Sequence, residues 1–200
     1  MTNSNLVEDF KRALDRCLHP EKNTDKMDVV SGIKYYYKVM ITPFILSLVL
    51  ATVLGYFGSN LLPGSGGIVG AVVGLVAVGF YFLILIPVGL LFVAGIIHLF
   101  AGLMLHIYKG DYSRTFTGVM FGALPLILFY WISFIPLVAI LYFIIGIWSI
   151  YVTVISLAKQ HNISNLNAFI GWLISYIIII IVYVLLIVLV GFGSLGLMHL

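Results

Sequence analysis

The chain has 200 residues, of which 62% are hydrophobic and only 8% are charged, with a formal net charge of +3. A mean hydropathy of +1.19 excludes an ordinary soluble globular domain. The small net charge, without a basic stripe or recognition motif, also gives no indication of nucleic-acid binding.

The charged residues are segregated along the chain. Residues 39–108, 115–158 and 160–200 contain no Asp, Glu, Lys or Arg. One such charge at the centre of a bilayer costs about 2.5–3.5 kcal/mol on insertion scales, which explains the exclusion. We therefore predict an all-α polytopic membrane protein in the lipid bilayer, with a cytoplasmic segment over residues 1–34 and a membrane domain over residues 35–200.

Residues 5–18 are expected to form an N-terminal amphipathic helix. Apolar side chains recur there at helical spacing, and charged side chains occupy the opposite face. His19 and Pro20 should end the helix, because the residue before proline avoids the α region. The apolar face either lies in the membrane interface or packs on the protein's own cytoplasmic surface. Residues 20–34 are expected to be a polar connector.

The apolar run over residues 67–108 decides the topology. As one helix it would measure about 63 Å, twice the thickness of a bilayer core, so one solution is two spans broken near Pro87. The other is a single span over about 82–108. It would follow a glycine-rich segment, residues 64–81, that enters without crossing or lies flat on the membrane.

The distribution of positive charge favours the single crossing. Seven of the ten Lys and Arg residues lie at or before Lys38, which places the N-terminus in the cytoplasm. With one crossing, Lys109, Arg114 and Lys159 are cytoplasmic as well, whereas two crossings would move them outside. We therefore predict a cell-membrane protein with five transmembrane helices, an external C-terminus and an irregular segment at 64–81. The spans are expected at 39–58, 82–108, 115–133, 137–158 and 167–190.

Small residues at four-residue spacing let helices approach closely. Gly66, Gly70 and Gly74 show this spacing in the glycine-rich segment, and Gly118 and Gly122 show it in the third predicted span. We expect tight packing within the bundle, although the same pattern is compatible with a homo-oligomer.

Catalytic constellations are scarce. Six of the seven carboxylates precede residue 29, and no nucleophile elbow, Walker loop or dinucleotide fingerprint is present. Cys17 is the single cysteine, so a disulfide within one chain is excluded. We predict a protein that is not an enzyme and that has no cofactor.

His98 is the polar residue of greatest interest within a predicted span. It lies eleven residues before Lys109, roughly 16 Å along a helix and therefore near the bilayer midplane, with His106 on about the same face. An intramembrane histidine can act as a proton relay or ligand contact, or remain a neutral imidazole bonded to a neighbouring helix. We favour the neutral role, because no carboxylate lies at that depth. A metal site would need a third ligand, and His161 belongs to a different turn.

The turn over residues 109–115 holds the only charged side chains between Lys38 and Lys159 and must lie at a membrane surface. Mid-span Trp148 is a further candidate, because its indole N–H needs a partner. The candidate functional residues of the turn are Lys109, Asp111, Tyr112 and Arg114.

Four short elements of the sequence form a pattern. They are His98-Leu-Phe-Ala, Lys109-Gly-Asp-Tyr-Ser-Arg-Thr, Met120-Phe-Gly-Ala-Leu-Pro125, and Trp148 through His161-Asn-Ile-Ser164. Over about residues 20–185 the chain resembles the Yip family, the Ypt-interacting proteins. Pro20-Glu21 looks like the pair that precedes the first span in prokaryotic members. The resemblance implies five spans and a cytoplasmic N-terminus.

The resemblance also implies a role. Eukaryotic members are implied in vesicle traffic and in binding Rab-type GTPases. This sequence is similar to the prokaryotic branch instead, because it lacks the Asp-Leu-Tyr-Gly-Pro element and the long cytoplasmic N-terminal region, so GTPase binding does not carry over. We expect membrane organisation or recruitment of a protein partner at the cytoplasmic face. The alternative is a small transporter or channel with a polar site around His98.

Overall fold

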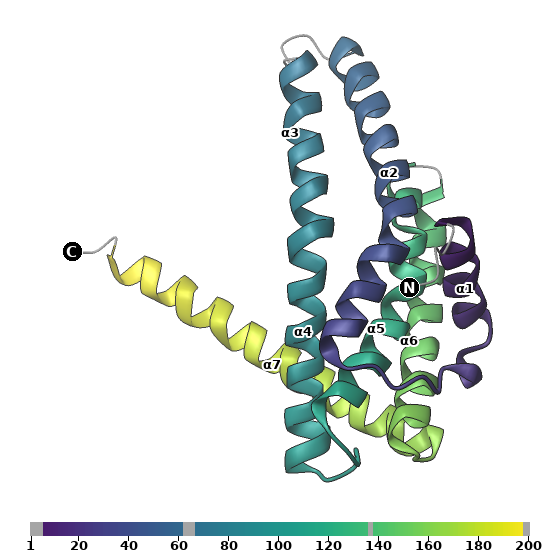
Figure 1. Cartoon of the computed structure of the whole chain (residues 1–200). Helices are drawn as coiled ribbons and strands as arrows, with labels where there is room; N and C mark the ends of the chain where they lie inside the picture. The colour runs from purple at the N-terminus through teal and green to yellow at the C-terminus, as the bar shows by residue number, and fades with distance from the viewer. Residues whose placement is uncertain (1–5, 62–66, 136–137, 198–200) are drawn as a thin grey trace.

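The computed structural model describes residues 6–61, 67–135 and 138–197, which form an all-α fold, as predicted. Successive long helices run in alternating directions, and α7 leaves the bundle at an angle (Figure 1). The α-helices are α1 (Leu6–Leu18), α2 (Val29–Leu61), α3 (Gly67–Phe80), α4 (Ile86–Ile97), α5 (Tyr112–Leu128), α6 (Ala139–His161) and α7 (Asn165–Leu197).

Four helical stretches among the described residues are long and apolar enough to cross a membrane, which makes this a multi-pass membrane protein. α5 has only 17 residues and continues as the 3-10 helix Tyr130–Phe134. The four candidate spans are Val29–Val53, Val72–Met104, Ile140–His161 and Asn165–Val182.

The expectation of an irregular segment at 64–81 is wrong for the residues of it that are described. α3 is a regular helix, and it continues through the π-helical segment Tyr81–Leu85, α4 and the π-helical segment His98–Met104 as one rod. The physical reason is the cost of the alternative. A glycine in a helix costs about 1 kcal/mol relative to alanine, whereas an unpaired backbone group in hydrocarbon costs several. Residues 64–66 lie outside the described part of the chain.

Pro87 does not break this rod into two spans. Its missing amide would have served the carbonyl of Leu83, four residues earlier. That carbonyl instead accepts a hydrogen bond from the Tyr37 hydroxyl at 2.8 Å, and the Phe82 carbonyl accepts one from the Tyr36 hydroxyl at 2.6 Å. Two adjacent tyrosines of α2 therefore satisfy backbone groups beside the proline and attach α2 to the rod.

Glycines bring α5 and α6 into close contact. A Cβ at Gly118 would lie 2.8 Å from Leu157 Cδ2, and one at Gly122 would lie 2.6 Å from Thr153 Cα. The prediction of tight packing within the bundle is confirmed at these two positions. It is wrong at Gly74, where an added Cβ would meet no atom within 4 Å.

α1 packs on the helical bundle of the protein itself, and the cytoplasmic position of this surface stays a prediction. Its Ala13 and Cys17 are fully buried, Phe10 packs against the core, and the helix contacts both α2 and α5. Burial raises the pKa of the Cys17 thiol to about 12. The helix ends at Leu18, as expected from the proline two residues later.

Two helix boundaries differ from the prediction. α2 begins at Val29, inside the expected connector, because the Asp28 side chain accepts a hydrogen bond from the backbone N–H of Ser31 at 3.3 Å. A hydrogen bond from the Ser31 side chain lowers the pKa of Asp28, and the bond from the Ser31 backbone adds to this effect. At the other end, α7 continues through Gly191 and Gly196 to Leu197, beyond the predicted end of the fifth span at residue 190.

Candidate functional site

Three polar segments that are distant in sequence meet at one end of the bundle. They are the connector after α1, the turn before α5 and the turn between α6 and α7. We call residues 19–28, 105–115 and 156–164 the polar end. Hydrogen bonds join each segment to α6 or to its terminal turn.

Buried amide side chains hold the connector against α6. Asn23 donates from Nδ2 to the hydroxyl of Ser156 at 3.1 Å and to the carbonyl of Arg16 at 3.2 Å. Gln160 donates from Nε2 to the carbonyls of Asn23 at 3.1 Å and Asp25 at 2.9 Å. Asn23 and Gln160 are each only 1% exposed. Because buried polar groups are costly to leave unpaired, these bonds fix the path of the connector.

A second set of bonds forms a chain through two histidines. His98 Nδ1 lies 3.0 Å from Thr115 Oγ1, which lies 3.1 Å from His161 Nε2. His161 Nδ1 lies 2.8 Å from the carbonyl oxygen of Lys109. Thr115 and His161 are almost completely buried. The chain therefore connects the π-helical segment after α4, the first turn of α5 and the end of α6.

The Lys109 carbonyl at one end of this chain determines which atoms donate along it. A carbonyl only accepts, so His161 Nδ1 carries a proton and donates to Lys109. With His161 neutral, its Nε2 accepts from the Thr115 hydroxyl, whose oxygen then accepts from His98 Nδ1. If His161 Nε2 gains a proton and His98 Nδ1 gives up its own, the Thr115 hydroxyl reverses: its oxygen accepts from His161 and its proton is donated to His98. The arrangement can hold or pass a proton between two imidazoles without moving a helix.

Tyr108 attaches this chain to α7. Its ring stacks on the His161 imidazole with 4.7 Å between centroids and an interplanar angle of 17°. Its hydroxyl donates to the carbonyl of Ala168 at 2.7 Å. A Cβ at Gly171 would lie 2.8 Å from the Tyr108 ring, so glycine is required for this approach. The start of α7 is therefore fixed to the turn before α5.

The charged candidates of the turn contact one another. Arg114 Nε lies 3.6 Å from Asp111 Oδ1, and Gly110 adopts a φ of +119°, which favours glycine. The Tyr112 hydroxyl donates to the carbonyl of Leu91 at 2.8 Å. Lys109 takes part in the histidine chain through its carbonyl rather than its ammonium group.

The structure places His98 and His106 differently from the prediction. The helix ends at Met104 instead of 108, so His98 lies only six residues from its end and beside the first turn of α5. His98 therefore lies closer to the turn before α5 than the predicted position near the bilayer midplane. His106 is not on the same face, because it follows the helix, is exposed and has a φ of +53°.

Two further expectations concern Trp148 and metal binding. The indole of Trp148 packs against Phe129 with ring centroids 6.3 Å apart. Among the described residues, no group of three or more His, Cys, Asp or Glu side chains is arranged to hold a metal ion.

Sequence reasoning missed the residues that join the segments. Thr115 was taken only as the end of the turn, and Asn23 and Gln160 were not singled out. Gln160 and His161 form a polar pair that directly follows an apolar span, and this pairing was an available signal. Asn23 gives no such signal, because it lies among other polar connector residues.

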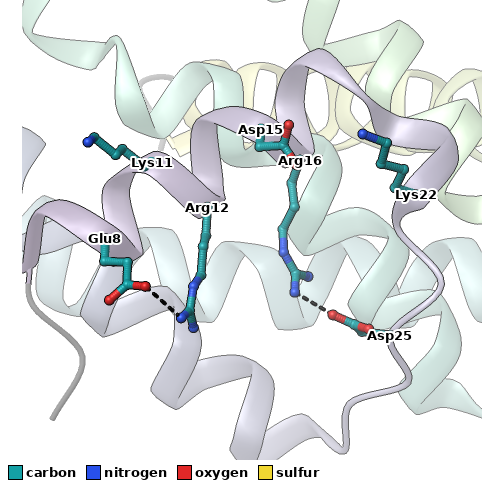
Figure 2. Close-up of a pocket in the computed structure, with 7 residues that line it drawn as sticks. All are labelled: Glu8, Lys11, Arg12, Asp15, Arg16, Lys22 and Asp25. Carbon is teal, nitrogen blue, oxygen red and sulfur yellow. Dashed lines mark hydrogen bonds and ion pairs between the residues drawn. The ribbon is translucent and has the colours of Figure 1, made fainter. Parts of the chain in front are cut away.

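The polar face of α1 lines an open cavity of about 460 Å³ (Figure 2). Arg12 pairs with Glu8 at 3.1 Å, and Arg16 pairs with Asp25. The Arg16 guanidinium also lies over the rings of Tyr35, at 5.0 Å, and Phe121, at 4.6 Å, which anchors α1 to α2 and α5. All the residues that line the cavity are charged: Glu8, Lys11, Arg12, Asp15, Arg16, Lys22 and Asp25.

Comparison with known proteins gives a family. The model of the Yip1 domain matches residues 19–189, which covers most of the 200-residue chain. No curated protein and no solved structure matches it. The match begins at the connector and includes the complete polar end as well as all four candidate spans. The chain belongs to the Yip1-domain family, as a multi-pass membrane protein.

Proposed function

We propose that this Yip1-domain protein is a non-enzymatic membrane scaffold that recruits a protein partner through its polar end. Its 10 basic and 7 acidic residues fall within residues 8–38, within residues 109–114 or at Lys159. This concentration of Lys and Arg supports a cytoplasmic N-terminus and a cytoplasmic polar end. We also propose that the protein is a prokaryotic-type member of the family and that it lies in the cell membrane.

The proposed topology has five crossings: the four candidate spans and α5, which is shorter than the others. α5 is buried among its neighbours over almost all of residues 115–128. A helix enclosed by protein does not need the length of one that faces lipid, because the neighbouring helices provide its apolar surroundings. An odd number of crossings places the C-terminus outside.

The observation that carries the scaffold role is the hydrogen bonding of the connector to α6. Asn23, Ser156 and Gln160 fix a charged segment in one conformation at the membrane surface. A pre-ordered surface loses less conformational entropy on binding a partner, and mixed charges give such a surface specificity.

A photo-crosslinking amino acid at the exposed Glu21 tests this role in native membranes. We expect discrete crosslinks to another protein, and their loss when Gln160→Leu releases the connector. The same amino acid at Ile181, on the apolar face of α7, is the matched control and should give lipid adducts. Equal protein crosslinks from both positions, or none from Glu21, would argue against a scaffold.

The topology is tested with cysteines in a Cys17→Ser background. Native Cys17 is unsuitable, because a buried thiol with a pKa of about 12 supplies little of the thiolate that reagents attack. A cysteine at Lys22 should be protected from impermeant reagent outside sealed right-side-out vesicles, and one at Leu200 should be labelled. Protection at Leu200 would indicate an even number of crossings.

The histidine chain favours a second function, a small proton-linked transporter or channel. It provides two imidazoles, from the π-helical segment after α4 and from α6, joined by a hydroxyl of α5. If this is the function, proteoliposomes should show a pH-dependent flux that His98→Gln abolishes. His106→Gln is the matched control, because His106 is exposed and outside the chain. A flux that survives His98→Gln would exclude this route.

A further inference from the structure

α7 turns away from the bundle after its first turns (Figure 1). Two adjoining cavities lie beside α6 and these first turns of α7. The larger, of about 600 Å³, lies between α6 and the first turns of α7. The smaller, of about 290 Å³, reaches α4 and α5. We call the two cavities together the α6–α7 groove. The residues that line both are Leu126, Ser149, Thr153 and Tyr176.

Three of the four hydroxyl groups that line the larger cavity are hydrogen-bonded to backbone carbonyls of the protein. Ser149 donates to the carbonyl of Gly122 at 2.6 Å, and Thr153 donates to the carbonyl of Ser149 at 2.7 Å. The Tyr142 hydroxyl contacts the carbonyl of Leu126 at 3.4 Å. These three hydroxyls therefore need no hydrogen-bonding partner from a molecule bound in the cavity. The rest of the wall is aliphatic or aromatic, which favours hydrocarbon over water.

Two glycines enlarge the groove without bringing helices together. A Cβ added at Gly146 of α6 or at Gly89 of α4 would meet no atom within 4 Å. Gly146 lines the larger cavity and Gly89 lines the smaller one. At these positions glycine costs helix stability and gains no helix contact, so its effect is to leave space.

The groove opens towards the apolar solvent of a membrane. α6 and α7 both contain candidate spans, and the groove-lining Phe143 and Ile147 of α6 are 70% and 56% exposed. An α-helix is about 10–12 Å wide and rises 1.5 Å per residue, so 600 Å³ would hold only about four or five residues of a second copy. A thinner occupant fits the volume better.

We propose that the α6–α7 groove binds one acyl chain of a membrane lipid. The chain lies against Trp172 and Tyr176, whose rings pack 4.5 Å apart on α7, and extends past Gly146. Such a chain supplies the apolar contacts that the diverging α7 does not make with α6. This site is independent of the polar end, so it stands even if the scaffold role is wrong.

Quenching of Trp172 fluorescence by a phosphatidylcholine with brominated acyl chains tests the proposal. Trp131→Phe and Trp148→Phe leave Trp172 as the only tryptophan of the reconstituted protein. We expect strong quenching that Gly146→Leu largely removes, because the leucine side chain occupies the space of the acyl chain. Gly95→Leu is the matched control and should keep the quenching, since Gly95 also has open space but lines neither cavity.

Three outcomes would overturn the proposal. Equal quenching in wild type, Gly146→Leu and Gly95→Leu would mean ordinary surrounding lipid. Weak quenching in wild type that rises as the protein is diluted in lipid would mean that a second copy fills the groove. If Gly146→Leu does not fold, Gly89→Leu narrows the groove from α4, and its unchanged quenching would exclude a bound chain.

Discussion

Gly118 and Gly122 of α5 bring two helix backbones into direct contact, where they meet Leu157 and Thr153 of α6. About two turns earlier along α6, Gly146 faces the open space beside α7. The residue type is the same and its effect is opposite. A glycine favours close packing only where another helix occupies the space in front of it, and the sequence pattern does not contain that information.

The largest expected difference between these two regions is in their tolerance of an added methyl group. Gly122→Ala would place its Cβ 2.6 Å from Thr153 Cα, and such overpacking costs about 1–3 kcal/mol or more. Gly146→Ala should instead be neutral or stabilise by up to about 1 kcal/mol, because alanine favours the helix. Thermal unfolding in detergent, followed by circular dichroism, measures both. Equal destabilisation by Gly122→Ala and Gly146→Ala would contradict this distinction between the two regions.

Hydrogen bonds give the next comparison. His161→Phe removes the link from α6 to α5 and leaves Thr115 and the carbonyl of Lys109 without this partner, at about 1–3 kcal/mol for each unsatisfied group. Ser175→Ala on the α7 side should cost little, since that hydroxyl bonds its own helix at Gly171. The same unfolding assay applies.

Lys109→Ala is the control for His161→Phe. It keeps the backbone carbonyl that His161 contacts, so stability should stay close to wild type. Trypsin cleavage after Arg114 should be accelerated by His161→Phe and unchanged by Lys109→Ala. A stability loss as large in Ser175→Ala as in His161→Phe would contradict the comparison.

The smallest expected effect separates two hydroxyls on α6 itself. Ser149 bonds across to the carbonyl of Gly122, so Ser149→Ala should cost about 1 kcal/mol. Thr153→Val should cost less, because the Thr153 hydroxyl only bonds one turn back along its own helix. Chemical denaturation of the two variants side by side measures the difference. A larger loss for Thr153→Val would show that packing outweighs the interhelical bond.

The all-α architecture and the position of the polar end could be predicted because charge is excluded from hydrocarbon. That rule marks Lys109 and Lys159 as surface positions. The rule does not predict that the backbone carbonyl of Lys109 accepts a hydrogen bond from His161. The contact between Lys109 and His161 depends on three-dimensional packing over 52 residues of chain.

Helix ends were less predictable than helix existence. Pro87 alone favoured a break, and only the tertiary contacts of Tyr36 and Tyr37 remove the reason for it. Likewise, Met104 ends its helix without a proline or a charged side chain nearby. His106 was therefore assigned to a helical face that does not exist.

The continuous rod has a consequence for the bilayer itself. Its candidate span Val72–Met104 has 33 residues, or about 50 Å of helix, against a hydrocarbon core of about 30 Å. Even a tilt of about 40°, the upper end of what spans adopt, leaves roughly 38 Å to accommodate. Because Tyr36 and Tyr37 attach α2 to the rod, both helices share this hydrophobic mismatch. We therefore expect the lipid around α2 and the rod to thicken locally.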